Sequence, residues 1–588
     1  MRALIGLVSL LALTWAAPAS AQSQSSSPRP NIVVIVVDDA AFTDFGAYGG
    51  EAHTPNIDAL AHRGAQFSRY YTSPLCAPSR AMLLTGADNH RTGVATIPEV
   101  LPPEQQGHRG YTMHLEPGVQ TIAQRLHAVG YRTLITGKWH LGHEAGDLPN
   151  DHGFDRSFVL DASGADNWDQ APYMPYNSYA PWFEDGRPAN LPSDFYSSRF
   201  IVDQMIRYLQ TDQSNTQPFF AYVAFQAVHI PVQAPREYTQ HYLHTYDAGW
   251  DALRAERARR AQELGLFPQG APIAPMFAHS QRWESLSPAD RALFSRSMAV
   301  YAAMLEAMDD NVGRLIAYLQ SRGLADNTIF VVTSDNGPEP SDPIHEAGFT
   351  QWMAVHGYTR NVDNLGERHS YNFIGPQWAA AAASPGELFK FYAAEGGVHV
   401  PLIMAGPGIN AARVDARAFV TDITPTLLDR AGAGAPPANS VPIAGRSLAS
   451  VLSGAAPSAY GPNDAVGIEV SGNSALYRGD YKLVRNTPRY GDNVWRLYDL
   501  ATDPGETHDL AHEQPALFAS MMDAYRAYAQ ANGVVEMPTG YDPQHQTARN
   551  ALMAQVHQYW WALVLIGLAL LALVWFGGRA MVRMLRKR

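Results

Sequence analysis

The sequence has almost no cysteine, with one residue, Cys76, among 588. A single cysteine excludes any disulfide bond within the chain. In an exported protein, an unpaired cysteine indicates either an intermolecular bridge or a reactive thiol. The simpler interpretation is a buried thiol that packs as a small apolar side chain. The count alone favours that simpler interpretation.

Positive charge is also scarce, since the formal net charge is −12 at pH 7. This balance argues against a broad nucleic-acid-binding surface, which needs clustered lysine and arginine. It does not exclude an anionic substrate, because a few cations in a pocket can reverse the local field. The remaining composition, 46% hydrophobic and 17% charged, is that of a globular chain with ample core.

The amino-terminal residues predict export. Residues 1–21 contain Arg2, an apolar run and the small residues Ala19-Ser20-Ala21, a pattern typical of a signal peptide with its cleavage site. An uncleaved anchor is the alternative, but the apolar run is short. A linker rich in serine and proline, residues 22–30, would then precede the folded protein.

The carboxyl-terminal residues predict a membrane anchor. Residues 559–576 are apolar throughout and long enough to cross a bilayer as a helix, with tyrosine and tryptophan at the ends. The alternative, a buried core helix, does not suit the basic tail 577–588 that follows. The tail predicts a cytoplasmic carboxyl terminus, so the rest of the protein would lie on the periplasmic or extracytoplasmic face of the inner membrane.

Between these ends the chain predicts an α/β domain, residues 31–464. "NIVVIVV" at 31–37 is a continuous β-branched run, as in a strand buried on both faces of a parallel sheet. Similar runs recur within residues 131–142, 218–229, 327–337 and 400–408, and amphipathic helical patterns lie between them. The alternation predicts a mostly parallel central sheet flanked by helices.

The pattern changes in residues 465–535. Short runs such as "VGIEV" and "YKLVRN" are separated by turns, and "PALFASMMDAYRAYAQANG" follows them. We expect a small antiparallel sheet with one packing helix. Residues 536–558 would form a juxtamembrane linker between this part and the anchor.

Polar side chains follow several of the predicted parallel strands. These are Asp38 and Asp39, Lys138 and His140, His229, and Asp335 and Asn336. Each alone is more often a cap, a turn or a core histidine. Because ligands of open α/β sheets bind beyond the carboxyl ends of the strands, we expect these side chains to form one site.

The chemistry of this predicted site is that of a metal ion beside an oxyanion. Carboxylate and amide oxygens are ligands for Ca²⁺ or Mg²⁺ rather than for zinc. Lys138, Arg80 and the histidines are donors that could hold a tetrahedral anion. The combination predicts sulfuryl or phosphoryl transfer with charge stabilisation.

The residues around Cys76 carry a family resemblance. Cys76-Ala77-Pro78-Ser79-Arg80 is a C-x-P-x-R motif followed by "AMLLTG", and further segments include "TPNIDALA", "GYRTLITGKWHLG", "VTSDNG" and "EGGVHVPLIMAGPG". With these motifs the chain resembles the type I sulfatases, in particular their bacterial arylsulfatase branch, within the alkaline phosphatase superfamily. The resemblance implies an alkaline-phosphatase-like fold and hydrolysis of small-molecule sulfate monoesters, aryl or alkyl.

The resemblance also implies a modified nucleophile and a metal. In this family a formylglycine-generating enzyme oxidises the cysteine of the motif to an aldehyde, whose hydrate is the nucleophile. Position 76 would then join the Ca²⁺ ligands, with Ca²⁺ expected rather than Mg²⁺. The implied protein ligands are Asp38, Asp39, Asp335 and Asn336.

The remaining roles are implied in the same way. Arg80 would steady the hydrate, and Lys138 and Lys390 would hold the sulfate oxygens. His229 would protonate the leaving oxygen, and His140 would take a proton from the second hydroxyl so that sulfate is expelled. The chain departs from the family at Gly396-Gly397-Val398-His399, where many members have "GGIR" or "GGVR". Because histidine replaces the arginine, we do not expect position 399 to supply a cation.

Two other functions compete with this one. A phosphonate monoester or phosphodiester hydrolase of the same superfamily could use the same aldehyde and metal. A catalytically silent protein that binds sulfated ligands would result if no modifying enzyme reached the chain. The intact C-x-P-x-R motif and the complete set of predicted ligands favour the sulfatase.

Overall fold

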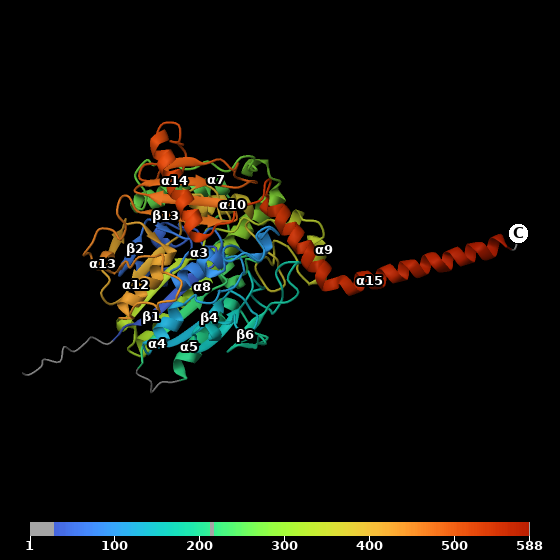
Figure 1. Cartoon of the computed structure of the whole chain (residues 1–588), viewed down its shortest axis with the longest axis horizontal. Helices are drawn as coiled ribbons and strands as arrows, with labels where there is room; N and C mark the ends of the chain where they lie inside the picture. Colours follow the sequence, from blue (N-terminus) through green and yellow to red (C-terminus); the bar gives the residue numbers. More distant parts are fainter. Residues whose placement is uncertain (1–28, 212–216, 587–588) are drawn as a thin grey trace, which may run out of the picture.

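The computed structural model describes residues 29–211 and 217–586, so the predicted signal peptide lies outside the described residues. A ten-stranded sheet in the order β11-β2-β10-β9-β1-β8-β4-β5-β6-β7 forms its centre (Figure 1). The strands are β1 (Asn31–Val37), β2 (Ala65–Phe67), β4 (Arg132–Lys138), β5 (Arg156–Leu160), β6 (Trp182–Glu184), β7 (Arg187–Pro188), β8 (Phe219–Ala224), β9 (Thr328–Ser334), β10 (Leu402–Ala405) and β11 (Ala412–Val414). Strands β9, β1, β8, β4 and β5 run parallel, and β10 and β6 are antiparallel to their neighbours. The predicted mostly parallel α/β fold is confirmed.

The sheet is covered by helices on both faces, which is why β1 is apolar at every position after Asn31. Val33, Ile35 and Val37 pack on one side with α1 (Pro55–His62), α5 (Ser197–Gln210), α7 (Trp250–Glu263), α8 (Pro288–Ser321) and α10 (Gly375–Ala382). Ile32, Val34 and Val36 pack on the other with α2 (Cys76–Thr85), α4 (Ile122–Ala128), α12 (Ile423–Arg430) and α13 (Ala449–Leu452). Alternate side chains of a strand point to opposite faces, so both faces of β1 belong to the core.

Shorter elements complete this part of the protein. They are the helices α3 (Asn89–Thr92), α6 (Arg236–His241), α9 (Phe349–Val355) and α11 (Glu395–Val398), the pair β3 (Tyr70–Tyr71) and β12 (Ala418–Phe419), and the 3-10 turns η1 (Gly46–Tyr48), η2 (Pro98–Val100), η3 (Pro149–His152), η4 (Trp283–Ser285), η5 (Ala325–Asn327), η6 (Pro343–His345) and η7 (Val420–Asp422). Several of them lie in the long connections that follow the parallel strands.

A second, antiparallel sheet follows the α/β part. Its strands are β13 (Ala465–Val470), β14 (Asn473–Arg478), β15 (Tyr481–Arg485) and β16 (Arg496–Asp499), and α14 (Pro515–Asn532) packs on it. Leu476, Leu483 and Leu497 of the sheet contact Met521 and Tyr525 of the helix. The predicted small antiparallel sheet with one helix is confirmed.

The chain ends in one long helix, α15 (Pro543–Leu585). The stretch 536–558, predicted as a linker, is therefore helical from Pro543 onward and lies against the body before the helix projects away (Figure 1). Among the described residues, the segment Tyr559–Arg583 is long and apolar enough to cross a membrane, with a mean hydropathy of 2.3.

Candidate active site

The predicted site residues meet at the carboxyl ends of four neighbouring strands, β9, β1, β8 and β4. Asp38 and Asp39 follow β1, Asp335 and Asn336 follow β9, and Lys138 is the last residue of β4. His229 lies in the connection after β8. Strand β1 has parallel neighbours on both sides, so its end is open to residues from several connections.

Local backbone geometry explains part of the "TGKWH" sequence, which includes the last residues of β4. Gly137 has a φ of 101°, and a Cβ atom there would lie 1.7 Å from the carbonyl oxygen of Ala224 in β8. Only glycine lets the two strands approach so closely beside Lys138. Asp39 and His140 also adopt positive φ angles, 66° and 61°, and such backbone strain is common at functional sites.

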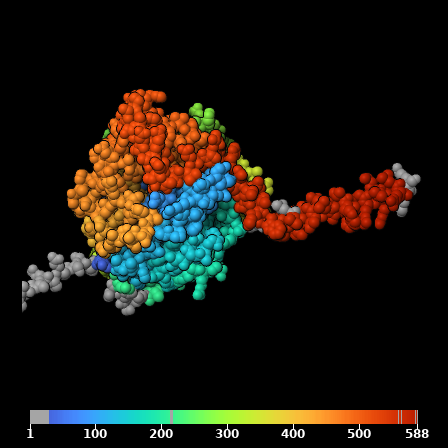
Figure 2. Space-filling view, viewed as in Figure 1, coloured from blue at the N-terminus to red at the C-terminus, as the bar shows by residue number. Residues whose placement is uncertain are grey.

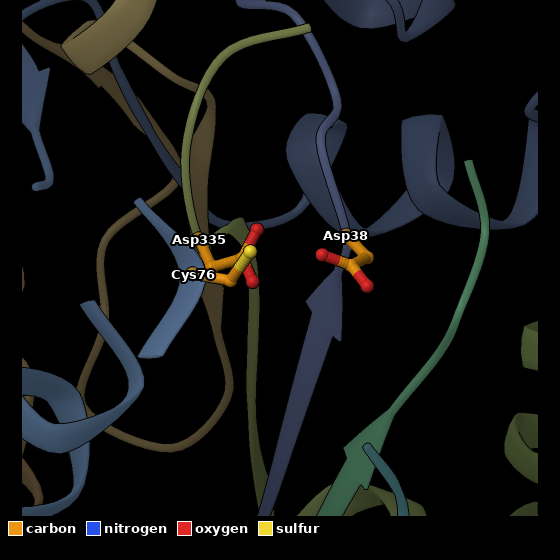
Figure 3. Close-up of side chains that lie close together, drawn as sticks. All are labelled: Asp38, Cys76 and Asp335. Carbon is orange, nitrogen blue, oxygen red and sulfur yellow. The ribbon is translucent and has the colours of Figure 1, made fainter. Parts of the chain in front are cut away.

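Cys76 and Arg80 come to the site on one helix. Cys76 is the first residue of α2, and Arg80 lies one turn later. The Arg80 guanidinium donates to Asp335 Oδ2 at 2.8 Å and to the carbonyl of Lys138 at 3.0 Å. Figure 3 shows the Cys76 sulfur beside the Asp335 carboxylate, facing Asp38, and one ligand atom from each lies within 4.8 Å of the others.

The oxygen atoms at this point fit a hard cation. Asp39 Oδ1 accepts from Asn336 Nδ2 at 2.6 Å, which brings the residues after β1 and β9 together. Within residues 29–211 and 217–586, Asp38 Oδ1 and Asn336 Oδ1 are buried and accept no hydrogen bond. Buried oxygens without a donor are costly unless another partner satisfies them. Ca²⁺ takes such carboxylate and amide oxygens as ligands.

Two buried lysines flank the acidic residues. Lys138 Nζ lies 2.7 Å from Asp38 Oδ2, and Lys390 Nζ lies 2.8 Å from Asp39 Oδ1. Burial by itself lowers the pKa of each lysine, but the neighbouring carboxylates outweigh burial and raise it. Both ammonium groups are therefore charged, and each has the chemistry to bind an anion.

The aspartates are buried, and burial disfavours their charged form. Burial raises the pKa of Asp38 to about 6, although Lys138 opposes the shift. Burial also raises the pKa of Asp335, but Arg80 and both lysines together bring it below its ordinary value. Neighbouring carboxylates raise one another's pKa, so the cluster as a whole favours a bound cation.

The two histidines are held neutral in this arrangement. Burial, together with the lysines, lowers the pKa of both His140 and His229 well below the ordinary value. His229 Nδ1 lies 2.6 Å from the carbonyl of Ile230, so Nδ1 carries the proton and Nε2 faces the site. His140 Nδ1 is buried without a hydrogen-bond partner among the described residues.

The thiol of Cys76 is not activated as a nucleophile. Burial raises its pKa to about 12, although Lys138 and Lys390 oppose the shift. The thiolate is the reactive form of cysteine, so this thiol is inert at neutral pH. Cys76 is also 1% exposed, and nothing here suits an intermolecular disulfide.

Glu339 belongs to the site and was not predicted. Its Oε2 lies 2.6 Å from Lys390 Nζ and 3.9 Å from His229 Nε2. Glu339 Oε1 accepts from the backbone and the hydroxyl of Ser341. The available sequence signal was a carboxylate three residues after Asn336, but its partner, Lys390, lies far along the chain.

His399, where the sequence departs from the family pattern, has a structural role. Its ring packs on Phe42 at 4.0 Å, and Nε2 lies 2.9 Å from the carbonyl of Ser68. Burial lowers the pKa of His399 to about 4. The position therefore carries a neutral ring at neutral pH and contributes no cation to the site.

Comparisons with known proteins agree with one another. A protein-family model described as Sulfatase matches residues 30–433. An arylsulfatase of Klebsiella aerogenes is 34% identical over 69% of this chain and 87% of that enzyme. An uncharacterized sulfatase of Schizosaccharomyces pombe is 33% identical over 88% of this chain and 96% of its own.

Solved structures show the same fold at lower identity. Ps i-CgsB in complex with k-i-k-neocarrahexaose superposes with a TM-score of 0.61 at 21% identity, covering 90% of this chain and 98% of that one. BT4656 in complex with D-glucosamine-2-N,6-O-disulfate superposes with a TM-score of 0.58 at 22% identity, covering 86% and 98%.

Proposed function

Because the chain belongs to the sulfatase family and is a sulfuric ester hydrolase, we propose that it hydrolyses aryl and alkyl sulfate monoesters with Ca²⁺ and a formylglycine made from Cys76. The observation that carries the proposal is the position of Cys76 beside Asp335 and facing Asp38, with one ligand atom of each residue within 4.8 Å of the others. If Cys76 is the precursor of formylglycine, its unreactive thiol in a charged site has an explanation, because the thiol itself takes no part in the reaction. As its hydrate, formylglycine would supply a hydroxyl nucleophile and a second hydroxyl that lets sulfate leave.

The metal would be held by Asp38, Asp39, Asp335 and Asn336 together with position 76, where it would polarise an oxygen of the sulfate group. Arg80 orients Asp335 and lies beside the nucleophile. Lys138 and Lys390 would bind sulfate oxygens, since both are charged and buried next to the acidic cluster.

The histidines would move the protons. His229 would donate from Nε2 to the leaving oxygen, and His140 would accept a proton when sulfate is released. Their neutral state without substrate supports the second role directly. The first role needs a proton on Nε2 as well as on Nδ1; burial and then the lysines lower the pKa of His229, and the negative charge of a sulfate ester in the site would act in the opposite direction, toward the doubly protonated ring.

We also propose that the protein is exported and anchored in the inner membrane, with the boundaries given by the sequence: signal peptide 1–21, catalytic domain 31–464, carboxyl-terminal subdomain 465–535, membrane helix 559–576 and cytoplasmic tail 577–588. The apolar segment Tyr559–Arg583 supports the anchor. A modifying enzyme would have to act before folding, because Cys76 is 1% exposed in the folded protein.

The deciding experiment combines mass spectrometry with kinetics. In protein co-produced with a formylglycine-generating enzyme, the peptide containing residue 76 should carry an aldehyde. Cys76→Ala should abolish turnover of 4-nitrophenyl sulfate and leave the circular dichroism spectrum unchanged. Ser79→Ala keeps the C-x-P-x-R pattern and should stay modified and active.

Three results would count against the proposal. An active Cys76→Ala protein would exclude the formylglycine mechanism. Higher catalytic efficiency on a nitrophenyl phosphonate ester than on the sulfate would favour the phosphonate hydrolase. A residue-76 peptide that keeps its cysteine despite co-production with the formylglycine-generating enzyme, in a protein that binds sulfate esters without turnover, would favour the silent binding protein.

A further inference from the structure

The first turns of α15 are bound to loops of the catalytic domain. Asn550 Nδ2 donates to the carbonyls of Pro98, Glu99 and Leu101, each at 3.0 Å. Farther along the helix, Gln555 Nε2 donates to the carbonyl of Pro175 at 3.4 Å. Figure 2 shows the light-blue surface around residue 100 directly beside the red carboxyl-terminal part of the chain.

These loops lead directly to the candidate active site. Glu99 Oε1 accepts from the hydroxyl of Ser163 at 2.6 Å, and the Tyr173 hydroxyl donates to the same Ser163 oxygen at 2.8 Å. The ring of Tyr173 then packs edge-on against His229, with centroids 5.5 Å apart. A short series of contacts therefore connects α15 with the group that would protonate the leaving oxygen.

The surroundings of His229 on this side are apolar. Ile230, the next residue, belongs to a buried cluster with Tyr173 and Phe349. Trp352 is half-buried against that cluster, and Val355 on the same helix, α9, is 82% exposed. This buried cluster therefore packs next to His229 at one end and carries α9, with its exposed Val355, at the other.

The helix also fixes how far this surface lies from a membrane. Asn550 contacts the loop, and the apolar segment begins at Tyr559. Nine residues of helix extend about 14 Å. If the apolar segment spans the bilayer, the loops that border the site lie close to the lipid surface, within reach of a lipid-embedded substrate.

We propose that the amino-terminal part of α15 is a wall of the active-site entrance that presents the site to the bilayer. The substrates would be sulfate monoesters of amphiphiles, whose apolar part stays in the membrane that anchors the enzyme. The proposal rests on the sulfatase function and the anchor proposed above. Confinement to one membrane raises the effective substrate concentration, because the apolar part of the substrate stays in the bilayer that holds the enzyme.

The test uses the full chain in phosphatidylcholine vesicles and two substrates, 4-methylphenyl sulfate and 4-hexadecylphenyl sulfate. Both leaving groups are alkylphenols of nearly equal acidity, so the chemical step is matched and only the tail differs. We expect at least tenfold higher kcat/KM for the long-chain ester when it shares the vesicles of the enzyme. When it is supplied in enzyme-free vesicles, that advantage should be lost.

A substitution in α15 tests whether this helix causes the preference for the long-chain ester. Asn550→Leu removes the amide that holds the 98–101 loop, and it should reduce the ratio of long-chain to short-chain kcat/KM at least fivefold. His545→Ala, at an exposed position of the same helix, is the matched control and should leave both rates unchanged.

Equal kcat/KM for the two esters, or equal hydrolysis from enzyme-free vesicles, would overturn the proposal. A ratio unchanged in Asn550→Leu would overturn the role of α15. Failure to hydrolyse even 4-methylphenyl sulfate would instead refute the underlying sulfatase function, so the two failures are distinguishable.

Discussion

At the scale of single residues, the assignment of His229 depends on which nitrogen carries the proton. The contact of Nδ1 with the carbonyl of Ile230 fixes the ring and leaves Nε2, 3.7 Å from Asp39 Oδ2, facing the site. A histidine fixed in this way can serve as a general acid or simply be a packed core residue. The dependence of rate on the leaving group distinguishes the two.

A general acid matters most for a poor leaving group, because an alkoxide needs a proton as the bond breaks, whereas nitrophenolate hardly does. General acid catalysis contributes roughly 10²–10⁴-fold. We expect His229→Ala to lose nearly that factor on alkyl sulfates and much less on 4-nitrophenyl sulfate. His140 would act only after the leaving group has gone, so His140→Ala should lower kcat alike for all substrates and leave kcat/KM nearly unchanged. The measurement is kcat/KM for substituted phenyl sulfates against leaving-group pKa; an unchanged slope for His229→Ala returns His229 to a structural role.

Glu339 is predicted to be a positioning residue that tunes Lys390. Its carboxylate lies 2.6 Å from the Lys390 ammonium and neutralises part of the charge that would bind sulfate. Glu339→Gln keeps the shape and removes the charge. We therefore expect inorganic sulfate, the product, to inhibit this variant ~5-fold more strongly, which corresponds to about 1 kcal/mol.

Ser341→Ala is the matched control for this prediction. It removes the hydroxyl that donates to Glu339 Oε1 but leaves the carboxylate in place, so sulfate inhibition should stay close to that of the original protein. An inhibition constant unchanged by Glu339→Gln would contradict the role, and equal changes in both variants would indicate a general disturbance of the loop.

The strand-end rule explains what the sequence could and could not predict about the site. Asp38, Asp335 and Lys138 directly end apolar runs, so their meeting follows from the parallel sheet itself. Glu339 and the contact of Lys390 with Asp39 depend on two long connections folding toward each other. No local pattern encodes such a contact, and for Lys390 only the family resemblance indicated it.

At the scale of elements, the same limit separates the long strands from the short ones. Strands β1, β4, β8 and β9 could be predicted from the sequence because both faces of the sheet are covered, so each strand is a nearly continuous apolar run. Strands such as β2 and β11 have three residues each and are defined by their pairing partners, not by their own pattern. Residues 536–558 were predicted as a linker, but the chain is helical from Pro543 onward; no apolar face marks this part of the helix, because its polar side chains bind loop carbonyls.

A buried ionic cluster joins the α/β domain to the antiparallel sheet. His90 of α3 lies between Asp88 Oδ1, at 3.1 Å, and Glu469 Oε2 of β13, at 2.7 Å. The Tyr528 hydroxyl of α14 donates to Asp88 Oδ2 at 2.8 Å. Burial by itself lowers the pKa of His90, but Asp88 and Glu469 outweigh it and raise the pKa to about 9.

This cluster predicts a pH-dependent stability. Because the folded pKa of His90 exceeds the unfolded value of about 6.5, its contribution is complete below pH 6.5 and is lost as pH rises through about 9. The contribution is of the order of 3 kcal/mol. We therefore expect the difference in unfolding free energy between the original protein and His90→Gln to be largest at pH 6 and to shrink toward pH 9.5.

Urea unfolding at several pH values measures this difference. His127→Gln, at an exposed position of α4, is the control and should leave the profile unchanged. A difference between the original protein and His90→Gln that stays constant from pH 6 to pH 9.5 would show that His90 contributes packing but no charge.

At the scale of the whole molecule, the acidic cluster lies where the main parts of the catalytic domain converge. Asp38 follows β1, Asp335 follows β9, and Cys76 begins α2, so a cation at this point would tie two central strands and a helix together. Without a cation the charged forms of Asp38 and Asp39 are disfavoured: burial raises the pKa of both, and neighbouring carboxylates raise it further. A ligand that binds only the folded state stabilises it by about 2.7 kcal/mol when present at a hundredfold excess over Kd.

Removal of Ca²⁺ should therefore lower both the sulfatase activity and the Tm, and added Ca²⁺ should restore both. Cys76→Ala separates the two effects, because it should be inactive yet keep the acidic oxygens and hence most of the Ca²⁺-dependent rise in Tm. Differential scanning fluorimetry with and without a chelator, alongside turnover of 4-nitrophenyl sulfate, makes the comparison. Activity that survives exhaustive chelation, or that returns with Zn²⁺ and not with Ca²⁺, would contradict the hard-cation assignment, since the oxygen donors here suit Ca²⁺.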